Sequence, residues 1–371
     1  MRVAIVGAGV AGLAIGWRLA QAGVSVEILE RGVAGRGATW ASAGMIAPGA
    51  ELGGETSVMA RYAREARAKW PGFAAELEEA SGKPVYYREV GSLLVAESAA
   101  KARMLEAQAA EFARQARGAA WLSPEELKKR EPLLSPALFG ALHNPDDAQV
   151  DNRALSGALS SALKNANVEV REHCEVRSLL VQEGVARALI TAEGTIEADR
   201  IVLACGAWMN LIGGIGLNDL PPVKPVKGQM AACEPPLGTS LPRSLIWAED
   251  VYLVPRHGRL FIGATVEDAS FDISVSREAR DSLLGAARRV IPAAAEWRLV
   301  EMWSGLRPRT PDDAPVLGAA AIENLYVASG QFRNGILFAP AVADSLSRLI
   351  LGEGASNEFS AFDPRRFANF C

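Results

Sequence analysis

The spacing of apolar residues changes along the chain and predicts different elements in turn. Residues 2–6 form a short apolar run, residues 10–22 place apolar side chains at helical spacing, and residues 24–29 form a second apolar run. This order predicts a strand, a helix and a second buried strand. Because the connection between parallel strands is right-handed, the unit predicts a parallel sheet whose ligands bind at the carboxyl ends of its strands.

Further segments have the amphipathic pattern of helices that cover a surface. Residues 57–82 and 99–118 are rich in Ala, Glu, Arg and Lys, and residues 336–351 form an apolar helical run. Ser123 and Glu126 have the spacing of a capping box, which predicts that another helix starts there.

The middle of the chain alternates with a period of two. Residues 244–256, 259–265 and 297–305 show this pattern, and His257 and Gly258 supply turn residues between the first two. The alternation predicts an antiparallel sheet that is distinct from the parallel one. It also places Asp250, Tyr252 and Val254 on one face of a strand.

The apolar runs 200–206 and 325–328, the second just before Gly330, again predict buried strands that end in glycine turns, so we expect pieces of the parallel domain to bracket the antiparallel one. A chain of 371 residues, of which 49% are hydrophobic, is long and apolar enough for roughly two domains. We expect the domain with the parallel sheet to comprise residues 1–80, 142–222 and 306–371, and the other domain residues 81–141 and 223–305.

The first turn has the GxGxxG spacing of a dinucleotide site. Gly7 turns the chain, Gly9 admits a pyrophosphate, and Gly12 lets helix and strand approach each other. The amides of Val10 and Ala11 at the helix start then meet the anion. A tight structural turn with no ligand is the alternative.

Glu30 ends the second strand, where an acidic residue is expected to hold ribose hydroxyls, and Arg31 follows it. An ordinary carboxylate at a strand end is the alternative for Glu30. The motif by itself does not distinguish FAD from a nicotinamide nucleotide.

Charge and composition exclude several other classes. A formal net charge of -4 offers no basic surface for nucleic acid. The cysteines form no CxxC pair and the histidines no cluster, so we expect no metal site, no Ser-His-Asp relay and reduced thiols. No stretch is long enough to span a bilayer, and we expect a cytoplasmic protein. The residues concerned are Cys174, Cys205, Cys233, Cys371, His143, His173 and His257.

Residues 3–31 and 36–48 resemble the flavin-binding start of the D-amino acid oxidase superfamily, and the glycine oxidase branch is the most similar. Further matches in the same order are residues 201–208, 225–229, 252–255, 263–265, 303–308 and 330–336. The resemblance implies an α/β fold in which a discontinuous Rossmann-like FAD-binding domain carries an inserted α+β substrate domain, built on an antiparallel sheet. A homo-oligomer is left open.

The resemblance also implies where FAD is held. Ser42, Ala43 and Gly44 resemble the segment beside the isoalloxazine, and Val176 resembles the residue whose main chain meets adenine. The fixed amides of a helix start can stabilise charge on the reduced ring, and the loop before the last helix is similar to the family's loop at that end. The other residues that we expect at the cofactor are Met45, Gly206, Trp208, Gly305, Arg307, Gly330, Arg333, Asn334, Gly335 and Ile336.

Two alternatives accompany these assignments: residues 333–335 only cap the last helix, and Val176 is a plain strand residue. Neither cysteine nor histidine occurs at residues 39–49 or 303–335, where relatives attach flavin covalently. We therefore expect noncovalent FAD.

Arg307 matches the family's carboxylate-binding arginine, whose planar fork gives two charge-assisted hydrogen bonds. Tyr252 resembles the hydroxyl donor to the same carboxylate, and Met45 resembles a residue above the substrate. The alternatives are a surface salt bridge for Arg307, a core tyrosine for Tyr252 and simple packing for Met45.

These residues imply oxidation of glycine, another small amino acid or a secondary amine by hydride transfer from the α carbon to flavin N5. The products are an imine and, with oxygen, hydrogen peroxide. The principal alternative is a D-amino acid or amine dehydrogenase that passes electrons to another acceptor. A nicotinamide-dependent dehydrogenase and a nucleotide-binding protein without catalysis are further alternatives.

Two departures from the glycine oxidase pattern leave the amine and the electron acceptor open. Val266 stands where that branch carries methionine, and Asp250 where it can carry histidine. A role in thiamine biosynthesis is implied by the resemblance alone, beside one in catabolism.

Overall fold

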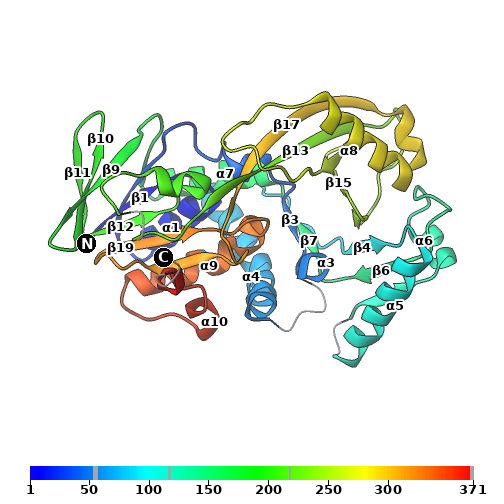
Figure 1. Cartoon of the computed structure of the whole chain (residues 1–371), viewed down its shortest axis with the longest axis horizontal. Helices are drawn as coiled ribbons and strands as arrows, with labels where there is room; N and C mark the ends of the chain where they lie inside the picture. Colours follow the sequence, from blue (N-terminus) through cyan, green and yellow to red (C-terminus); the bar gives the residue numbers. More distant parts are fainter. Residues whose placement is uncertain (53–56, 116–117, 217–218, 368–371) are drawn as a thin grey trace.

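The computed structural model describes residues 1–52, 57–115, 118–216 and 219–367. The molecule is elongated, with a mainly parallel sheet toward one end and a mainly antiparallel sheet toward the other (Figure 1). The predicted fold class is confirmed. Within the described ranges no helix is both long and apolar enough to cross a membrane.

The six-stranded sheet has the order β18-β19-β12-β1-β2-β8, and all its pairs are parallel except β18 with β19. Val6 pairs with both Leu29 and Leu203, so three strands reach the same edge of the sheet. The strands are β1 (Arg2–Val6), β2 (Ser25–Leu29), β8 (Glu169–Arg171), β12 (Arg200–Leu203), β18 (Val316–Ala319) and β19 (Leu325–Ser329).

Alternate residues of β1 pack against different layers. Val3 and Ile5 join the core beneath the helices, whereas Ala4 and Val6 pack toward a three-stranded antiparallel sheet. The helices are α1 (Val10–Gln21), α4 (Val58–Ser81), α7 (Asn152–Asn165) and α9 (Gly335–Ile350). The small sheet consists of β9 (Val176–Gln182), β10 (Val185–Thr191) and β11 (Thr195–Glu197). The parallel sheet is therefore covered on both faces, as its continuous apolar strands require.

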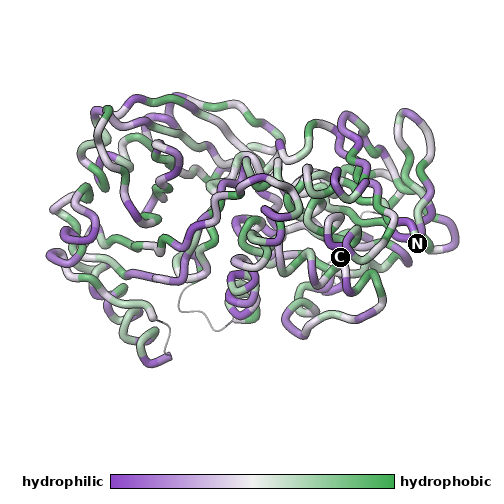
Figure 2. Tube along the Cα trace, turned by 180° about the vertical axis from the view of Figure 1, so that it is seen from behind, coloured by the Kyte–Doolittle hydropathy of each residue, from purple (hydrophilic) through white to green (hydrophobic). Residues whose placement is uncertain are grey.

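The eight-stranded sheet has the order β17-β13-β16-β15-β14-β4-β6-β5, in which β14 and β4 form a parallel pair. Its strands are β4 (Ser92–Val95), β5 (Ala120–Leu122), β6 (Ala141–Asn144), β13 (Lys224–Glu234), β14 (Leu245–Trp247), β15 (Tyr252–Arg256), β16 (Arg259–Gly263) and β17 (Arg298–Arg309). Helices α5 (Ala99–Arg114), α6 (Pro124–Arg130) and α8 (Arg277–Val290) pack against it. Helix α5 carries both hydrophilic and hydrophobic residues (Figure 2) and buries only Leu105, Ala109 and Phe112, as expected of a surface helix.

Shorter elements complete the chain. They are α2 (Ala38–Ala41), β3 (Met45–Ile46), α3 (Pro48–Leu52), β7 (Ala148–Gln149), η1 (Gly206–Leu211), η2 (Pro292–Glu296), α10 (Asn357–Ser360) and η3 (Pro364–Phe367). The β3–β7 pair lies between the two large sheets (Figure 1), and α2 precedes β3 in the chain. The eight-stranded sheet includes residues 142–144 and 306–309, which the predicted boundaries assign to the other domain. Those boundaries stay a prediction.

Most of the predicted elements are confirmed, and some of their limits are wrong. Ser57 and Gly82 cap α4, and Ser123 forms the predicted capping box. Helix α5 ends at Arg114, and residues 116 and 117 of the predicted helix lie outside the described residues. The predicted strand 244–256 is two strands, β14 and β15, because residues 248–251 turn the chain between them.

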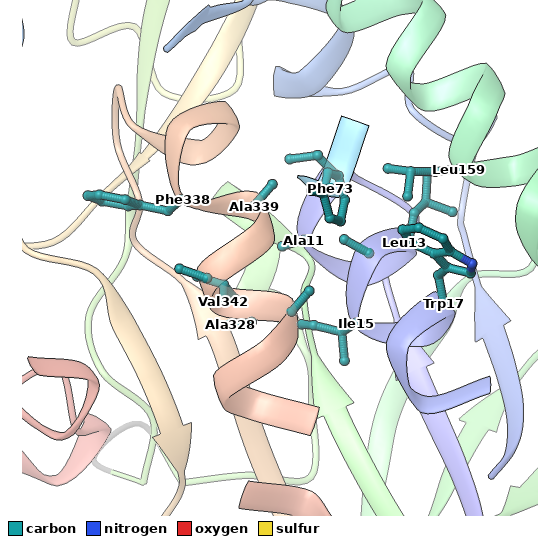
Figure 3. Close-up of a cluster of buried hydrophobic side chains, with 14 of the residues drawn as sticks. Ala11, Leu13, Ile15, Trp17, Phe73, Leu159, Ala328, Phe338, Ala339 and Val342 are labelled. Atoms are coloured by element: carbon teal, nitrogen blue, oxygen red, sulfur yellow. The ribbon is translucent and has the colours of Figure 1, made fainter. Parts of the chain in front are cut away.

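The core beneath the parallel sheet holds the fold together at α1 and α9. Figure 3 shows Ile15 and Leu13 of α1 in the same apolar cluster as Phe338 and Val342 of α9. Phe338 is fully buried, and its ring centroid lies 5.2 Å from that of Tyr62.

We expect Phe338→Ala to lower the free energy of unfolding by about 3 to 5 kcal/mol, because it removes a buried ring and leaves a cavity. Urea unfolding followed by circular dichroism measures the change. Leu237→Ala is the control, since Leu237 is fully exposed and its truncation should change stability little. A loss below about 1 kcal/mol for Phe338→Ala would contradict this packing.

Candidate functional site

A cavity of about 620 Å³ begins at the carboxyl ends of β1, β2 and β12 and reaches β13, β15 and β17 of the other large sheet. Its size is that of a site for a cofactor or a small ligand. The predicted residues that line it are Gly7, Gly9, Val10, Ala11, Glu30, Arg31, Ser42, Ala43, Gly44, Met45, Val176, Gly206, Trp208, Tyr252, Gly305, Arg307, Arg333, Asn334, Gly335 and Ile336. Of the described residues predicted to meet the cofactor, Gly12 and Gly330 are the exceptions.

The glycine-rich turn is packed backbone against backbone. A Cβ atom on Gly7 would lie 2.5 Å from the carbonyl oxygen of Ala204, and one on Gly12 would lie 2.0 Å from that of Gly7. Gly9 differs, because its nearest neighbour would be Thr39 Oγ1 at 3.5 Å. Gly12 thus allows the close approach of helix and strand without lining the cavity, and the space beside Gly9 stays open.

Hydrogen bonds fix the residues around this turn. The Glu30 carboxylate accepts from the amides of Ala8 and Gly32, each at 2.9 Å. Thr39 Oγ1 accepts from the amide of Val10 at 2.9 Å, a contact that the sequence pattern does not indicate. Beside Glu30, the Arg31 guanidinium lies 4.0 Å from the ring centroid of Trp208. The cavity therefore has a polar end, formed by the residues around the glycine-rich turn.

The residues present fit a flavin dinucleotide. The N-terminal turns of both α1 and α9 line the cavity. The N-cap residue of α1 is Gly9, which has no side chain to cap the helix, and the side chain of Asn334 does not cap α9. The buried Nε2 of Gln331, which also lines the cavity, has no hydrogen-bond partner. The Val10 amide, expected to meet an anion, is instead occupied by Thr39 Oγ1. The next amides at the start of α1, those at the start of α9 and the side-chain amide of Gln331 suit an anionic, oxygen-rich group.

Two cysteines, Cys174 and Cys205, also line the cavity, which the sequence analysis missed. Burial raises the pKa of the Cys205 thiol to about 12, and burial likewise raises the pKa of Cys174. Both are therefore neutral thiols and poor nucleophiles at neutral pH. The described cysteines, Cys174, Cys205 and Cys233, form no disulfide, and Cys371 lies outside the described residues.

The opposite end of the cavity contains Arg307 of β17 and Tyr252 of β15, two strands that are separated by β13 and β16 in the eight-stranded sheet. Arg307 Nη1 donates to the carbonyl of Thr265 at 3.1 Å, and its guanidinium fills the space over Gly228, where a Cβ would lie 2.3 Å from it. The Tyr252 ring occupies the corresponding space over Gly263. Burial raises the pKa of Tyr252, so its hydroxyl is a neutral donor.

Glu51 of α3 is a residue of this pocket that the sequence analysis missed. Its carboxylate forms an ion pair with Arg333 at 3.1 Å, and the Arg333 guanidinium lies 5.6 Å from the ring centroid of Trp247. Burial raises the pKa of Glu51, and Arg333 partly offsets this effect. Glu51 lies just beyond the matched segment 36–48, and nothing in its local pattern marks it.

Asp147 holds α3, and with it Glu51, in place. Its carboxylate accepts from the amides of Gly49 at 2.9 Å and Ala50 at 3.0 Å, and from the Ser92 hydroxyl at 2.6 Å. Asp147 is fully buried, and burial raises its pKa to about 6 in spite of these donors. A buried carboxylate thus positions the start of a short helix at the pocket wall.

One expectation about the strand that carries Tyr252 is wrong. Asp250 does not share a face with Tyr252, because β15 begins at Tyr252 and Asp250 instead forms an ion pair with Arg289 of α8 at 2.5 Å. Val266 is 60% exposed and does not line the cavity. The departures at these two positions therefore do not alter the described pocket wall.

Comparison with known proteins agrees with this geometry. A family model described as FAD dependent oxidoreductase, DAO, matches residues 2–349. The chain is 36% identical to the bifunctional protein ThiO/ThiG of Synechocystis sp., over 98% of this chain but 54% of that protein. It spans about half the length of this relative. It is 34% identical to glycine oxidase of Geobacillus kaustophilus, over 99% of this chain and 96% of that one.

Solved structures give the same result. The crystal structure of glycine oxidase from Geobacillus kaustophilus matches with a TM-score of 0.92, covering 98% of this chain and 99% of that one. The crystal structure of iminodiacetate oxidase from Chelativorans sp. BNC1 matches with a TM-score of 0.89 at 27% identity, over 98% of this chain and 99% of that one.

The raised pKa of Asp147 predicts a specific pH dependence of stability. Since the folded protein holds this proton up to a pH of about 6 and the unfolded chain releases it near 3.8, unfolding releases a proton between these values. We expect the free energy of unfolding to fall on the order of 3 kcal/mol as pH rises from about 4 to 6 because of this group. Urea unfolding over this range, in the parent protein and in Asp147→Asn, isolates its effect. Parallel pH profiles for the two proteins would refute it.

Proposed function

Given that the chain belongs to the DAO family of FAD-dependent oxidoreductases, we propose that it oxidises glycine, another small amino acid or a secondary amine at the carbon next to nitrogen. FAD, rather than a nicotinamide nucleotide, is confirmed as the cofactor of this family. One observation carries the proposal: Arg307 and Tyr252 line the same cavity as the dinucleotide turn.

Arg307 binds the carboxylate of the substrate. The guanidinium is held from behind by the Thr265 carbonyl and lies against Gly228, which leaves its other donors for an anion. Two parallel charge-assisted hydrogen bonds then fix both the position and the orientation of the carboxylate. The neutral Tyr252 hydroxyl, which lies close to Arg307, adds a third donor.

The chain's part in the chemistry is orientation. Bound FAD would supply the two-electron acceptor, and its isoalloxazine would lie beside Ser42, Ala43 and Gly44. With the carboxylate fixed at Arg307, the α carbon of the substrate is held in one position, and a neutral amine can lose hydride without a strong base. In the described part of the chain, no histidine lines the cavity, which agrees with such a reaction.

The first half of the proposed reaction needs only the amine, bound FAD and water; the second half needs an electron acceptor that reoxidises the flavin. The amine loses a hydride from carbon and a proton from nitrogen to give an imine. Water converts the imine of a primary amine into an oxo acid and ammonia, and that of a secondary amine into the corresponding carbonyl compound and primary amine. Oxygen, reduced to hydrogen peroxide, is the acceptor that the names of the oxidase relatives favour. A non-oxygen acceptor is the alternative, and peroxide formation during turnover distinguishes them.

The cofactor is bound noncovalently in this proposal. The two cysteines that line the cavity, Cys174 and Cys205, are neutral thiols. They flank Val176, which resembles the adenine contact, whereas residues 39–49 and 303–335, which resemble the surroundings of the flavin ring, contain no cysteine. Acid precipitation should therefore leave a colourless pellet and release yellow FAD into the supernatant.

We expect Arg307→Ala to retain FAD and to lose binding of carboxylated amines by about 10-fold or more, because each charged hydrogen bond contributes about 1.5 to 3 kcal/mol. Anaerobic bleaching of the flavin by glycine, sarcosine, D-alanine and D-proline measures this. Arg309→Ala is the matched control, because Arg309 lies on the same strand and pairs with Asp313 at the surface. Undiminished affinity in Arg307→Ala would exclude it as the carboxylate site.

We expect Gly228→Ala to weaken binding of the same substrates although it removes no functional group, because the added Cβ would lie 2.3 Å from the Arg307 guanidinium and displace it. The measurement is again anaerobic flavin reduction, with FAD content determined from the visible spectrum. Gly285→Ala in α8 is the control, because nothing lies within 4 Å of its added Cβ. Equal substrate affinity in the two variants would contradict the role of Gly228.

A further inference from the structure

Three charged side chains meet at the substrate end of the cavity, and only two of them are paired with each other. Glu51 and Arg333 form an ion pair at 3.1 Å, with 14% of the Glu51 side chain and 36% of the Arg333 side chain accessible. Arg307 donates instead to the backbone carbonyls of Thr265 and Lys227. All three line the same cavity.

The charges of these groups decide how many anions the pocket accepts. The Glu51 carboxylate neutralises Arg333, so this end of the cavity has one unbalanced positive charge, on Arg307. One substrate carboxylate balances it. A second carboxylate at Arg333 would either lie beside the Glu51 carboxylate and be repelled by it, or displace Glu51 and leave that carboxylate unpaired in a partly buried site; both cost free energy.

Glu51 is also held so that it cannot easily leave the pair. Glu51 belongs to α3, and the amides of Gly49 and Ala50 at the start of this helix donate to the buried Asp147 carboxylate. Trp247, whose ring lies beside the Arg333 guanidinium, limits that side chain from the other direction. The pair is therefore part of the pocket wall rather than a chance contact of two mobile surface groups.

We propose that Glu51 sets the charge selectivity of the site: by occupying Arg333 it restricts the enzyme to amines with one carboxylate and rejects amines with two. This inference rests on the proposed function, since it takes Arg307 as the site of the first carboxylate. It divides the proposed substrate class between glycine or N-alkyl glycines on one side and imino diacids on the other. Glu51 is a specificity residue here, and Arg333 is a latent second anion site.

The test uses two inert ligands that differ only by a second carboxylate. Methoxyacetate and diglycolate are the ether counterparts of sarcosine and iminodiacetate, and they lack the amine that would be oxidised. Each is titrated into the FAD-loaded protein, and binding is followed by the change in the visible flavin spectrum. In the parent protein we expect methoxyacetate to bind at least about 10-fold more tightly than diglycolate.

In Glu51→Gln we expect diglycolate to bind about 10-fold or more tightly than it does in the parent, because Arg333 becomes free to bind its second carboxylate. Methoxyacetate should change by less than about 3-fold. The double variant Glu51→Gln with Arg333→Gln is the matched control and should lose the gain for diglycolate. Glu51→Ala removes the same charge and replaces Glu51→Gln if the amide disturbs folding.

The outcomes separate this inference from the function on which it rests. If methoxyacetate does not bind the FAD-loaded parent protein, the proposed carboxylate site fails, and the selectivity fails with it. If methoxyacetate binds normally but both single Glu51 variants discriminate against diglycolate as strongly as the parent, the selectivity alone is overturned. The ratio of kcat/KM for sarcosine to kcat/KM for iminodiacetate should fall in the same variants, as a second measurement.

Discussion

The cavity depends on close packing of backbone against backbone where three parallel strands end. At Gly7 and Gly12 there is no space for a Cβ, because carbonyl groups of the neighbouring turns lie where it would be. This packing brings α1 close to the ends of β1 and β12, and its first amides then face the space beyond the sheet. If side chains filled these positions, the helix would move away, and the dinucleotide end of the pocket would lose its donors.

A second constraint joins this end to the substrate end. The segment that includes α2 and β3 runs between the two large sheets and is bound from both sides. Trp303 Nε1 of β17 donates to the carbonyl of Ala41, and Asn152 of α7 donates to the carbonyls of Thr39 and Trp40. Gly305 allows β17 to approach Ala41 closely, since its Cβ would lie 2.3 Å from that of Ala41. The residues that resemble the isoalloxazine contacts therefore follow a segment whose position is fixed by β17 of the eight-stranded sheet and by α7.

These two constraints explain what the sequence could predict. The turn with Gly7, Gly9 and Gly12 is a local signal, because its parts are neighbours in the chain and its spacing is set by one turn and one helix. The two sheets and the long helices were also accessible from local periodicity. Arg307 and Tyr252 were found through a resemblance to a family, since a strand arginine or tyrosine has no local pattern that marks it as functional. The alternation of apolar and polar residues predicts one strand through residues 248–251, because a short turn hardly interrupts this pattern.

What the sequence did not predict depends on contacts between distant segments. Asp147 reaches Gly49 and Ala50 across about a hundred residues of chain, and Glu51 meets Arg333 across a still longer separation. No pattern within one segment carries such a pairing. The signal that was present is weaker: Gly228 lies inside β13 and Gly263 ends β16, and glycine in a strand indicates that another group approaches closely. In this structure the approaching groups are the side chains of Arg307 and Tyr252.

The charges at the substrate end of the cavity, like its packing, depend on contacts between distant segments. A partly buried guanidinium needs partners for its donors, and Arg307 obtains them from backbone carbonyls rather than from a carboxylate. Carbonyl groups satisfy its donors without neutralising its charge, so the attraction for an anion is retained. Arg333 differs, because the Glu51 carboxylate both accepts from its guanidinium and neutralises its charge. Two arginines that a sequence shows as equivalent thus differ in what they can bind, and this difference comes from which kind of oxygen each one meets.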